Sequence, residues 1–290
     1  MFLKIPYRVF IQILFVGLSM KTIIIPTDFS SAADNAMHYG AQLAQQLQAS
    51  VLLLHVYMVP ITMNDMPVLM VTAEELKGGA EEGLSRCKGE LEAAYPGLVV
   101  KTESRLGDVV GELKEMCKEK DPQLVVLGTH GSSEVEKFIF GSNAFSAIKH
   151  LQHPIIAVPS QFAYQPIQTL VLAADLAAVD ESTRNQIISL LRLFPNSQLH
   201  IVHVKSEDEE ATAQPPLVQQ LQELTPAYEA IQHDNISVGL QNYIHKIAAD
   251  LLVVLPHEHS MLESWFFKMH TKDIVKNAQV PVLCIHTGRV

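Results

Sequence analysis

Three glycines and a serine follow one another along a short segment at a spacing that suits the binding of an anion. Gly128, Gly131 and Gly141 precede Ser142 in the pattern G-x2-G-x9-G-S, and a helical pattern begins at that serine. Glycine allows backbone amides to approach an anion closely, and the start of a helix adds free N–H groups and a favourable dipole. The Ser142 hydroxyl can donate a further hydrogen bond. The segment therefore predicts a phosphate-binding loop, with an ordinary flexible turn as the alternative.

Catalysis has less support from the same residues. The chain contains neither the G-x-S-x-G pattern of a serine nucleophile nor the G-x4-G-K-[ST] pattern of a P-loop hydrolase. His130 and Lys137 are the candidates near the loop for neutralising phosphate charge, which phosphoryl transfer requires. Slow ATP hydrolysis, or self-phosphorylation on Ser132, Ser133 or Ser142, is therefore a lesser alternative to simple binding.

The apolar strand patterns that would hold this loop occur twice along the chain. Residues 22–27 read TIIIPT and residues 169–174 read TLVLAA, and each run is followed by an aspartate, Asp28 or Asp175. Because each copy is as long as a domain, duplication of a whole domain explains the similarity better than a short solenoid repeat. The other matched pairs are Ser50–Val56 with Gln198–Val204, Val99–Ser104 with Ala227–Gln232, Asp121–Leu127 with Ala249–Leu255, and the short strands after Pro154 and Pro281.

Helical patterns alternate with these strands, which fixes the class of fold. They cover residues 32–48, 109–120, 142–151, 181–194, 236–248 and 270–278. Apolar strands that alternate with helices require a parallel sheet covered on both faces. We therefore predict an α/β protein with two tandem, doubly wound, five-stranded domains, at residues 20–160 and 168–287. The polar segment Ser160–Ile167, which contains Pro166, is the predicted linker.

In such a sheet a ligand binds at the carboxyl ends of the strands, where the strand order changes direction. In the first half this edge collects Asp28, His55 with Val56, the pair Gly107-Asp108, and Gly128. Asp28 has two candidate roles, because Asp-Phe-Ser-Ser ahead of an alanine-rich helix is also a good helix start signal. Direct contact with a ligand and helix capping are both open for this residue.

Together, the glycine pattern, Ser142 and the aspartate after the first strand resemble the signature of the universal stress proteins, in their ATP-binding branch. The resemblance extends over nearly the whole chain from Met20, as a tandem pair of family domains. It implies a flavodoxin-like, Rossmann-like (HUP-type) sheet of strand order 3-2-1-4-5, pairing through the fifth strand, and a cytoplasmic role in stress survival. In a tandem member the two halves can pair as an internal pseudo-dimer, and two chains can pair again as a homodimer.

The resemblance also assigns an adenine nucleotide, ATP or AMP with or without Mg2+, to the first half. It places Asp28 at the adenine-ribose end, sets the backbone of His55 or Val56 beside the base, and wraps the loop amides around the phosphates. The implied nucleotide-binding residues are Pro26, Thr27, Asp28, His55, Val56, Gly128, His130, Gly131, Gly141, Ser142 and Asn143. The predicted function is a nucleotide-responsive stress-survival module without efficient turnover. The alternative is an adaptor whose glycine loop is vestigial or holds another anion.

The second half departs from this pattern. Aligned on the fourth strand, the residues that replace Gly128, Gly131, Gly141 and Ser142 are Pro256, His259, Met269 and His270. Proline lacks the amide N–H that glycine provides. The larger side chains at the other positions would occupy the space that the phosphates need. One nucleotide per chain is therefore expected, in the first half.

Two other features of this replacement loop could have a function. His257, His259 and His270 could contribute to a metal site, but no carboxylate or cysteine completes a recognised set, so no metal is predicted. Residues 265–267, which read WFF, are expected to pack the loop onto its own domain, with an exposed partner-binding patch as the alternative.

The composition sets limits on partners. The 21 basic and 31 acidic residues leave a net charge of −10 at pH 7, which argues against a surface built to hold nucleic acid or an anionic membrane. Cys87, Cys117 and Cys284 are too few and too widely spaced for a disulfide framework. They are expected to be small core residues.

The first 19 residues are open to two interpretations. Lys4 and Arg8 precede a largely apolar run, Val9–Leu18, and Gly17-Leu18-Ser19 resembles a signal-peptidase site. The run is too short to span a bilayer, which needs about 20 apolar residues. The favoured alternative is that Met20 is the true start, which leaves a cytoplasmic protein.

Overall fold

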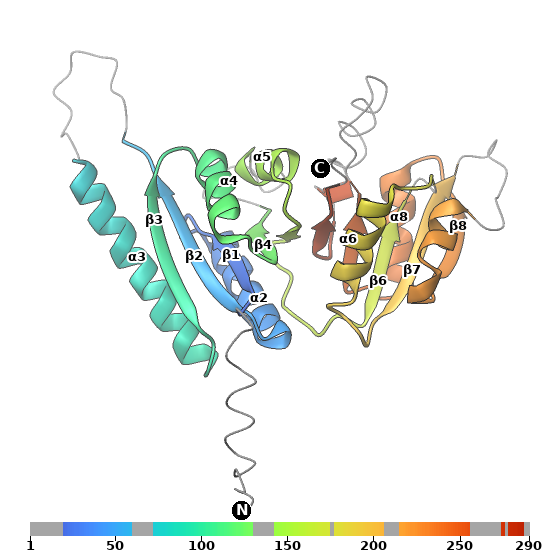
Figure 1. The fold of residues 1–290 in the computed structure, drawn as a ribbon, viewed down its shortest axis with the longest axis horizontal. Helices are drawn as coiled ribbons and strands as arrows, with labels where there is room; N and C mark the ends of the chain where they lie inside the picture. Colours follow the sequence, from blue (N-terminus) through green and yellow to red (C-terminus); the bar gives the residue numbers. More distant parts are fainter. Residues whose placement is uncertain are drawn as a thin grey trace, which may run out of the picture.

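The structure, a computed structural model, describes residues 20–59, 72–129, 142–174, 177–205, 215–255, 274–275 and 278–286. These residues form one ten-stranded sheet flanked by helices (Figure 1). The predictions for residues 1–19, for the loop His130–Gly141, for Asp175 and for residues 256–273 lie outside the described residues. The predicted helix at 270–278 also lies mostly outside them.

The first half of the sheet has five parallel strands in the expected order. Neighbouring strands pair in the order β3-β2-β1-β4-β5, which confirms the order 3-2-1-4-5. The aliphatic residues of β1, β4 and β5 are buried, as a parallel sheet with both faces covered requires. The strands are β1 (Thr22–Pro26), β2 (Ser50–Tyr57), β3 (Val100–Leu106), β4 (Leu124–Gly128) and β5 (Ile155–Val158).

The second half repeats this order. Its strands are β6 (Thr169–Ala173), β7 (Gln198–Lys205), β8 (Ala227–Gln232), β9 (Leu251–Val254) and β10 (Val282–Cys284). They pair in parallel in the order β10-β9-β6-β7-β8. β5 and β10 pair antiparallel, with Ile156 opposite Leu283. The fifth strands of the two halves therefore join two five-stranded sheets into one.

The helices form two layers, one on each face of the sheet. Alternate residues of β1 divide between the layers, because Ile23 and Ile25 belong to one apolar cluster and Ile24 to the other. The first layer contains α2 (Ser31–Leu47), α3 (Ala73–Ala94), α6 (Glu181–Leu191) and α7 (Pro216–Gln220), with the 3-10 turn Gln222–Leu224 after it, and the second contains α4 (Val109–Lys120), α5 (Ser142–His150) and α8 (Ile236–Lys246). None of the described helices is long and apolar enough to cross a membrane.

The helical patterns taken from the sequence miss α3. This helix buries only a narrow stripe, Ala80, Leu84, Cys87 and Leu91, and its other positions are mostly charged residues and glycines. Its start carries a capping box, in which Thr72 Oγ1 accepts from the amide of Glu75 at 3.2 Å and Glu75 Oε2 accepts from the amide of Thr72 at 2.8 Å. The T-x-x-E sequence of that box was the available signal. In the second half the five-residue α7 lies between the corresponding strands, which explains why that half is shorter.

The predicted linker is a packed connector, residues 159–168, without helix or strand. Asn35 of α2 donates from Nδ2 to the carbonyl oxygens of Pro159, at 3.0 Å, and Phe162, at 3.2 Å. Further along the connector, a glutamine side chain donates to Asp250 of the second half at 2.8 Å. The connector is therefore attached to both halves by side chains.

All three cysteines lie in the core, as predicted: Cys87 is 7% exposed, Cys117 1% and Cys284 0%. Burial raises the pKa of the Cys117 and Cys284 thiols to about 12, and it also raises that of Cys87. Because the thiolate is the reactive form, we expect the thiols of the native protein to react with Ellman's reagent at least about a hundredfold more slowly than free cysteine. In concentrated guanidinium three thiols per chain should react promptly. A fast-reacting thiol in the native protein would contradict this burial.

Candidate functional site

The carboxyl ends of β2, β1 and β4 lie next to one another at one edge of the sheet, where the strand order changes direction (Figure 1). Most of the described candidate residues meet at this edge: Pro26 ends β1 and is followed by Thr27 and Asp28, His55 and Val56 lie near the end of β2, and Gly128 ends β4. α5 begins at Ser142, and Asn143 is exposed in its first turn. His130, Gly131 and Gly141 lie outside the described residues, so the shape of the phosphate loop stays a prediction.

The turn from β1 into α2 is held by short polar contacts. Thr27 Oγ1 accepts from the amide of Phe29 at 3.0 Å, and Asp28 Oδ1 accepts from the amide of Ser30 at 3.0 Å. The helix itself is capped by Ser30, whose Oγ accepts from the amide of Ala33 at 3.2 Å. Of the two roles open for Asp28, capping therefore belongs to Ser30. The Asp28 carboxylate is exposed at the sheet edge.

An aromatic wall stands beside Asp28. Phe29 has a left-handed backbone with φ 62°, which is unusual for a residue with a side chain. Its ring stacks on the His55 imidazole, with centroids 4.3 Å apart and planes at 21°. On the α3 side, a Cβ at Gly83 would lie only 2.5 Å from Cζ of Phe29, so the absence of a side chain there lets the ring pack against the helix. Sequence reasoning missed Phe29, and its position between Asp28 and Ser30 was the only signal for it.

The His55 ring also ties two strands together. Its Nδ1 donates to the carbonyl oxygen of Thr27 at 2.8 Å, which joins the end of β2 to the end of β1. The second half repeats the contact, because Nδ1 of His203 donates to the carbonyl oxygen of Ala174 at 3.1 Å. A contact present in both halves, including the one without the glycine pattern, is part of the architecture. The imidazole of His55 therefore acts as a strand tie and as one side of the aromatic wall.

Gly128 brings a strand and a helix into unusually close contact. A Cβ at this position would lie 2.7 Å from the carbonyl oxygen of Ala32 and 3.1 Å from its carbonyl carbon. Ala32 lies in the first turn of α2, immediately after the polar turn that holds Asp28. Glycine at position 128 therefore has a packing reason in addition to the phosphate contact predicted from the sequence. The first turn of α2 can lie against β4 only because position 128 carries no side chain.

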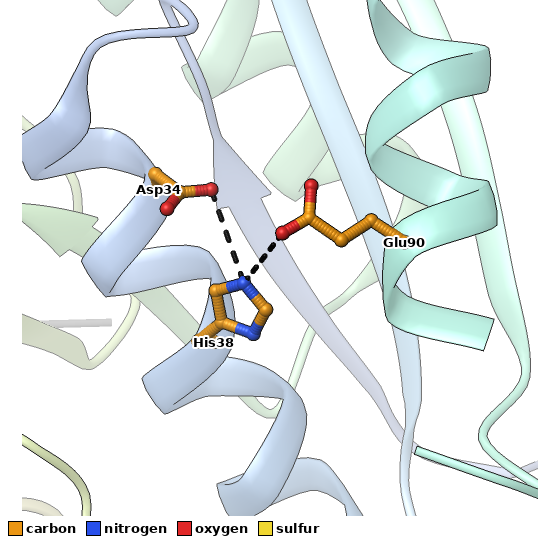
Figure 2. A group of neighbouring side chains, drawn as sticks. All are labelled: Asp34, His38 and Glu90. Atoms are coloured by element: carbon orange, nitrogen blue, oxygen red, sulfur yellow. Dashed lines mark hydrogen bonds and ion pairs between the residues drawn. The ribbon is translucent and has the colours of Figure 1, made fainter. Parts of the chain in front are cut away.

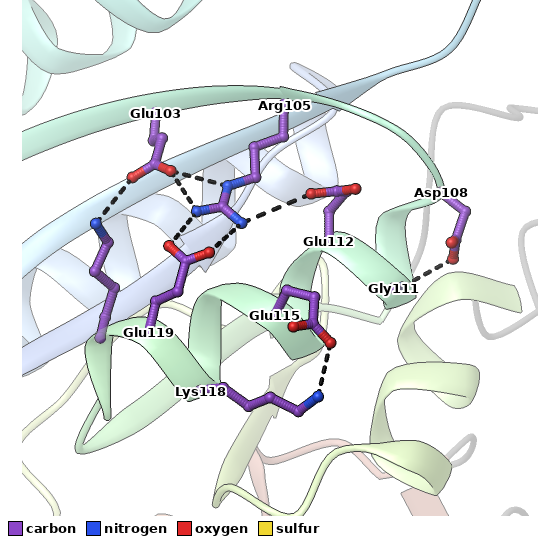
Figure 3. A network of polar contacts seen from close by, with 9 residues as sticks. Glu103, Arg105, Asp108, Gly111, Glu112, Glu115, Lys118 and Glu119 are labelled. Carbon is purple, nitrogen blue, oxygen red and sulfur yellow. Dashed lines mark hydrogen bonds and ion pairs between the residues drawn. The ribbon is translucent and has the colours of Figure 1, made fainter.

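Gly107 and Asp108, which follow β3, have a structural role. Asp108 caps α4 by accepting from the amide of Gly111 at 2.9 Å (Figure 3). Beside it, Arg105 of β3 contacts the carboxylates of Glu103 and Glu119, each at 2.6 Å, and that of Glu112 at 3.7 Å. The guanidinium is thus surrounded by acidic groups and is not directed at an anion at the sheet edge. This network joins β3 to α4.

These contacts define what the edge can do. Asp28 presents an exposed carboxylate that can accept hydrogen bonds from hydroxyl or amino groups of a ligand. The aromatic wall gives a flat apolar surface next to it, and the N-terminus of α2 brings its positive dipole end to the same edge. The arrangement suits binding more than bond breaking. The fold is a doubly wound α/β sheet whose strand order occurs twice, and its first half carries Asp28 and the aromatic wall at the edge where folds of this class bind ligands.

Comparison with known proteins gives the family. The model described as the universal stress protein family matches residues 20–159. Universal stress protein G of Salmonella typhimurium is 31% identical over 143 residues, which cover 48% of this chain and 98% of that protein. A universal stress protein of Methanocaldococcus jannaschii is 29% identical over 140 residues, covering 48% of this chain and 81% of that one. The chain belongs to the universal stress protein family.

Both halves share their fold with a solved structure. The crystal structure of a universal stress protein from Archaeoglobus fulgidus superposes with a TM-score of 0.71. The match covers 93% of this chain and 100% of that one, at 14% sequence identity. At that identity the likeness concerns the fold alone, and it extends beyond the first half that the family model matches.

Proposed function

We propose that the first half binds one adenine nucleotide, ATP or AMP, with or without Mg2+, and that the bound nucleotide controls a stress-survival role without efficient turnover. The observation that carries the proposal is the convergence of Asp28, Val56 and Gly128 on three neighbouring strand ends at the point where the strand order reverses. An exposed carboxylate suits the ribose hydroxyls, and the aromatic wall offers an apolar face near the base.

The phosphate end of the proposed site uses the glycine loop. Gly128 leads into it from β4, and Ser142 and Asn143 receive it at the start of α5. The amides of His130, Gly131 and Gly141, together with the Ser142 hydroxyl, are proposed to hold the phosphates. The second half has none of these glycines, so one nucleotide per chain is expected.

The proposal predicts that replacing Asp28 with alanine weakens ATP binding by about 10- to 100-fold, the equivalent of one or two hydrogen bonds to a charged acceptor. Isothermal titration of the full chain with ATP and with AMP, each with and without Mg2+, measures the affinity and the number of sites. Asp175→Ala is the matched control, because Asp175 holds the corresponding place in the degenerate half. It should leave the affinity and the single site unchanged.

Three results would count against the proposal. These are two ATP equivalents per chain, unchanged ATP affinity after Gly131→Trp, and a wild-type protein that neither retains a purine on purification nor changes its melting temperature with ATP. The last result would favour the adaptor, in which the glycine loop is vestigial. A timed phosphate-release assay on wild type and Gly131→Trp tests the third possibility, a slow ATPase or a protein that phosphorylates its own serines.

Several coarser features belong to the same proposal. The repeated strand order supports two domains, at residues 20–160 and 168–287, that act as an internal pseudo-dimer through β5 and β10. A homodimer of whole chains, a cytoplasmic location and the absence of nucleic-acid and membrane partners are proposed with them. Analytical ultracentrifugation with and without ATP measures whether whole chains form a homodimer.

A further inference from the structure

Three side chains with metal-binding atoms converge between α2 and α3 (Figure 2). Nε2 of His38 is 3.0 Å from Oε1 of Glu90 on α3 and 3.9 Å from Oδ1 of Asp34, which lies one turn earlier in α2. The three ligand atoms all lie within 4.8 Å of one another. The four-residue spacing puts Asp34 and His38 on one face of α2, and α3 supplies the third group from the opposite side.

The second ring nitrogen of His38 has its own partner. Nδ1 is 3.0 Å from the hydroxyl oxygen of Tyr95, at the C-terminal end of α3. Without an ion, Nε2–H donates to Oε1 of Glu90 and Nδ1 accepts from the Tyr95 hydroxyl. When a metal ion takes the place of the Nε2 proton, the neutral ring can carry its proton on Nδ1 and donate it to the phenol oxygen. Histidines that bind metals usually donate their other ring N–H to an acceptor oxygen, most often of a carboxylate, a backbone carbonyl or water, which fixes the ring orientation. Here the Tyr95 hydroxyl oxygen is placed to act as that acceptor.

The spacing of the three groups is close to that around a bound ion. Ligand atoms about 2.0 Å from a tetrahedral zinc ion are roughly 3.3 Å apart. The contact between His38 and Glu90 is already close to this separation, at 3.0 Å, and Oδ1 of Asp34 lies 3.9 Å from the same nitrogen. The two carboxylates have to approach each other from a separation of at most 4.8 Å. The side chains of Asp34 and Glu90 are 52% and 48% exposed, so both carboxylates can rotate and water can complete the coordination.

We infer that Asp34, His38 and Glu90 form a binding site for one divalent transition-metal ion of the zinc class. An imidazole ligand favours Zn2+ over Mg2+ and Ca2+, which prefer oxygen ligands. The ion bridges α2 and α3, and in the described part of the second half only the short α7 stands where α3 would be. Among the described residues, a site of this kind therefore occurs once. It shares no residue with the proposed nucleotide site.

The test is calorimetric titration of the full, chelator-treated chain with Zn2+ in the absence of nucleotide. We expect one tight site in the wild type, and at least about tenfold weaker binding in His38→Gln and in Glu90→Gln. Tyr95→Phe should keep the single site and weaken it by about tenfold, because Tyr95 only positions the imidazole. Co2+ substituted for Zn2+ should give a visible absorption band that His38→Gln abolishes.

The matched control is His153→Gln, because His153 faces a single carboxylate, that of Asp121, at 3.6 Å in the same half. It should leave zinc affinity unchanged. Thermal unfolding in chelator shows whether each variant is folded, and added Zn2+ should raise the melting temperature of the wild type and of His153→Gln but not of His38→Gln. Zinc affinity that is unchanged in His38→Gln, or that is lost only in His257→Gln or His259→Gln, would overturn the inference. So would an absence of zinc binding by the wild type.

Discussion

Replacing Asp250 with alanine is expected to lower the free energy of unfolding by about 2–4 kcal/mol. Asp250 is 9% exposed, and its carboxylate accepts hydrogen bonds from the backbone amides of Gln168, at 2.8 Å, and Thr169, at 2.9 Å, as well as from Gln165 Nε2 at 2.8 Å. Truncation removes the acceptor and leaves part-buried N–H groups without a partner. Urea denaturation at neutral pH, followed by circular dichroism, measures the change.

Two further variants separate the charge from the contacts. Asp250→Asn keeps one acceptor oxygen for the backbone amides, so we expect it to cost about half as much as Asp250→Ala. Asp234→Ala removes an exposed carboxylate in the same half and should change stability by less than about 0.5 kcal/mol.

A second readout follows from the position of these contacts. They fasten the connector to the second half, so Asp250→Ala should also speed chymotrypsin cleavage at Phe162, which lies in the connector. An Asp250→Ala protein as stable and as resistant to cleavage as Asp234→Ala would show that the connector is not held by this carboxylate.

The strands could be predicted because buried parallel strands leave a strong local signal. Runs such as TIIIPT are apolar, β-branched and too short for a helix, and the structure places β1 within that run. α3 could not be predicted from its narrow apolar stripe, because exposed glycines and charged residues dilute the helical period. The fourth strand of the first half begins at Leu124 and not at Asp121, because Asp121 ends α4 in a left-handed conformation with φ 44°. Boundaries of this kind depend on capping geometry that the apolar pattern does not contain.

The candidate site was predictable to the level of a sheet edge and no further. Asp28, His55 and Gly128 could be assigned to one edge, because parallel strands end together. Their individual contacts could not be assigned, since they depend on tertiary geometry. Ser30 caps the helix in place of Asp28, and the ring of Phe29 stacks on His55 through a backbone conformation that sequence pattern does not indicate. The cluster of Asp34, His38 and Glu90 could not be predicted either, because Glu90 lies on α3, the helix that the sequence pattern did not indicate.

Replacing Gly128 with alanine is expected to destabilise the protein by about 1–3 kcal/mol. The new methyl group would lie 2.7 Å from the carbonyl oxygen of Ala32, and that neighbour is backbone, so the first turn of α2 has to move away from β4. Gly107→Ala is the matched control, because its methyl group meets side chain and not backbone: it would lie 2.5 Å from Oε1 and 2.8 Å from Cγ of Glu112, a flexible side chain that can turn aside. Neither glycine has a positive φ, so both variants test contact and not backbone conformation. The control should change stability by less than about 0.5 kcal/mol.

The same pair of variants tests whether the packing at Gly128 supports the nucleotide site. Ala32 follows Ser30 and Asp28 in one continuous turn, so a displacement of α2 carries the Asp28 carboxylate with it. We therefore expect Gly128→Ala to bind ATP at least about tenfold more weakly at a temperature where it is fully folded, while Gly107→Ala binds as the wild type does. If Gly128→Ala is less stable but binds ATP as tightly as the wild type, Gly128 has a packing role only, and the position of α2 does not affect ATP binding. Unchanged stability in Gly128→Ala would contradict the close approach of strand and helix, because a methyl group cannot lie 2.7 Å from a carbonyl oxygen unless one of them moves.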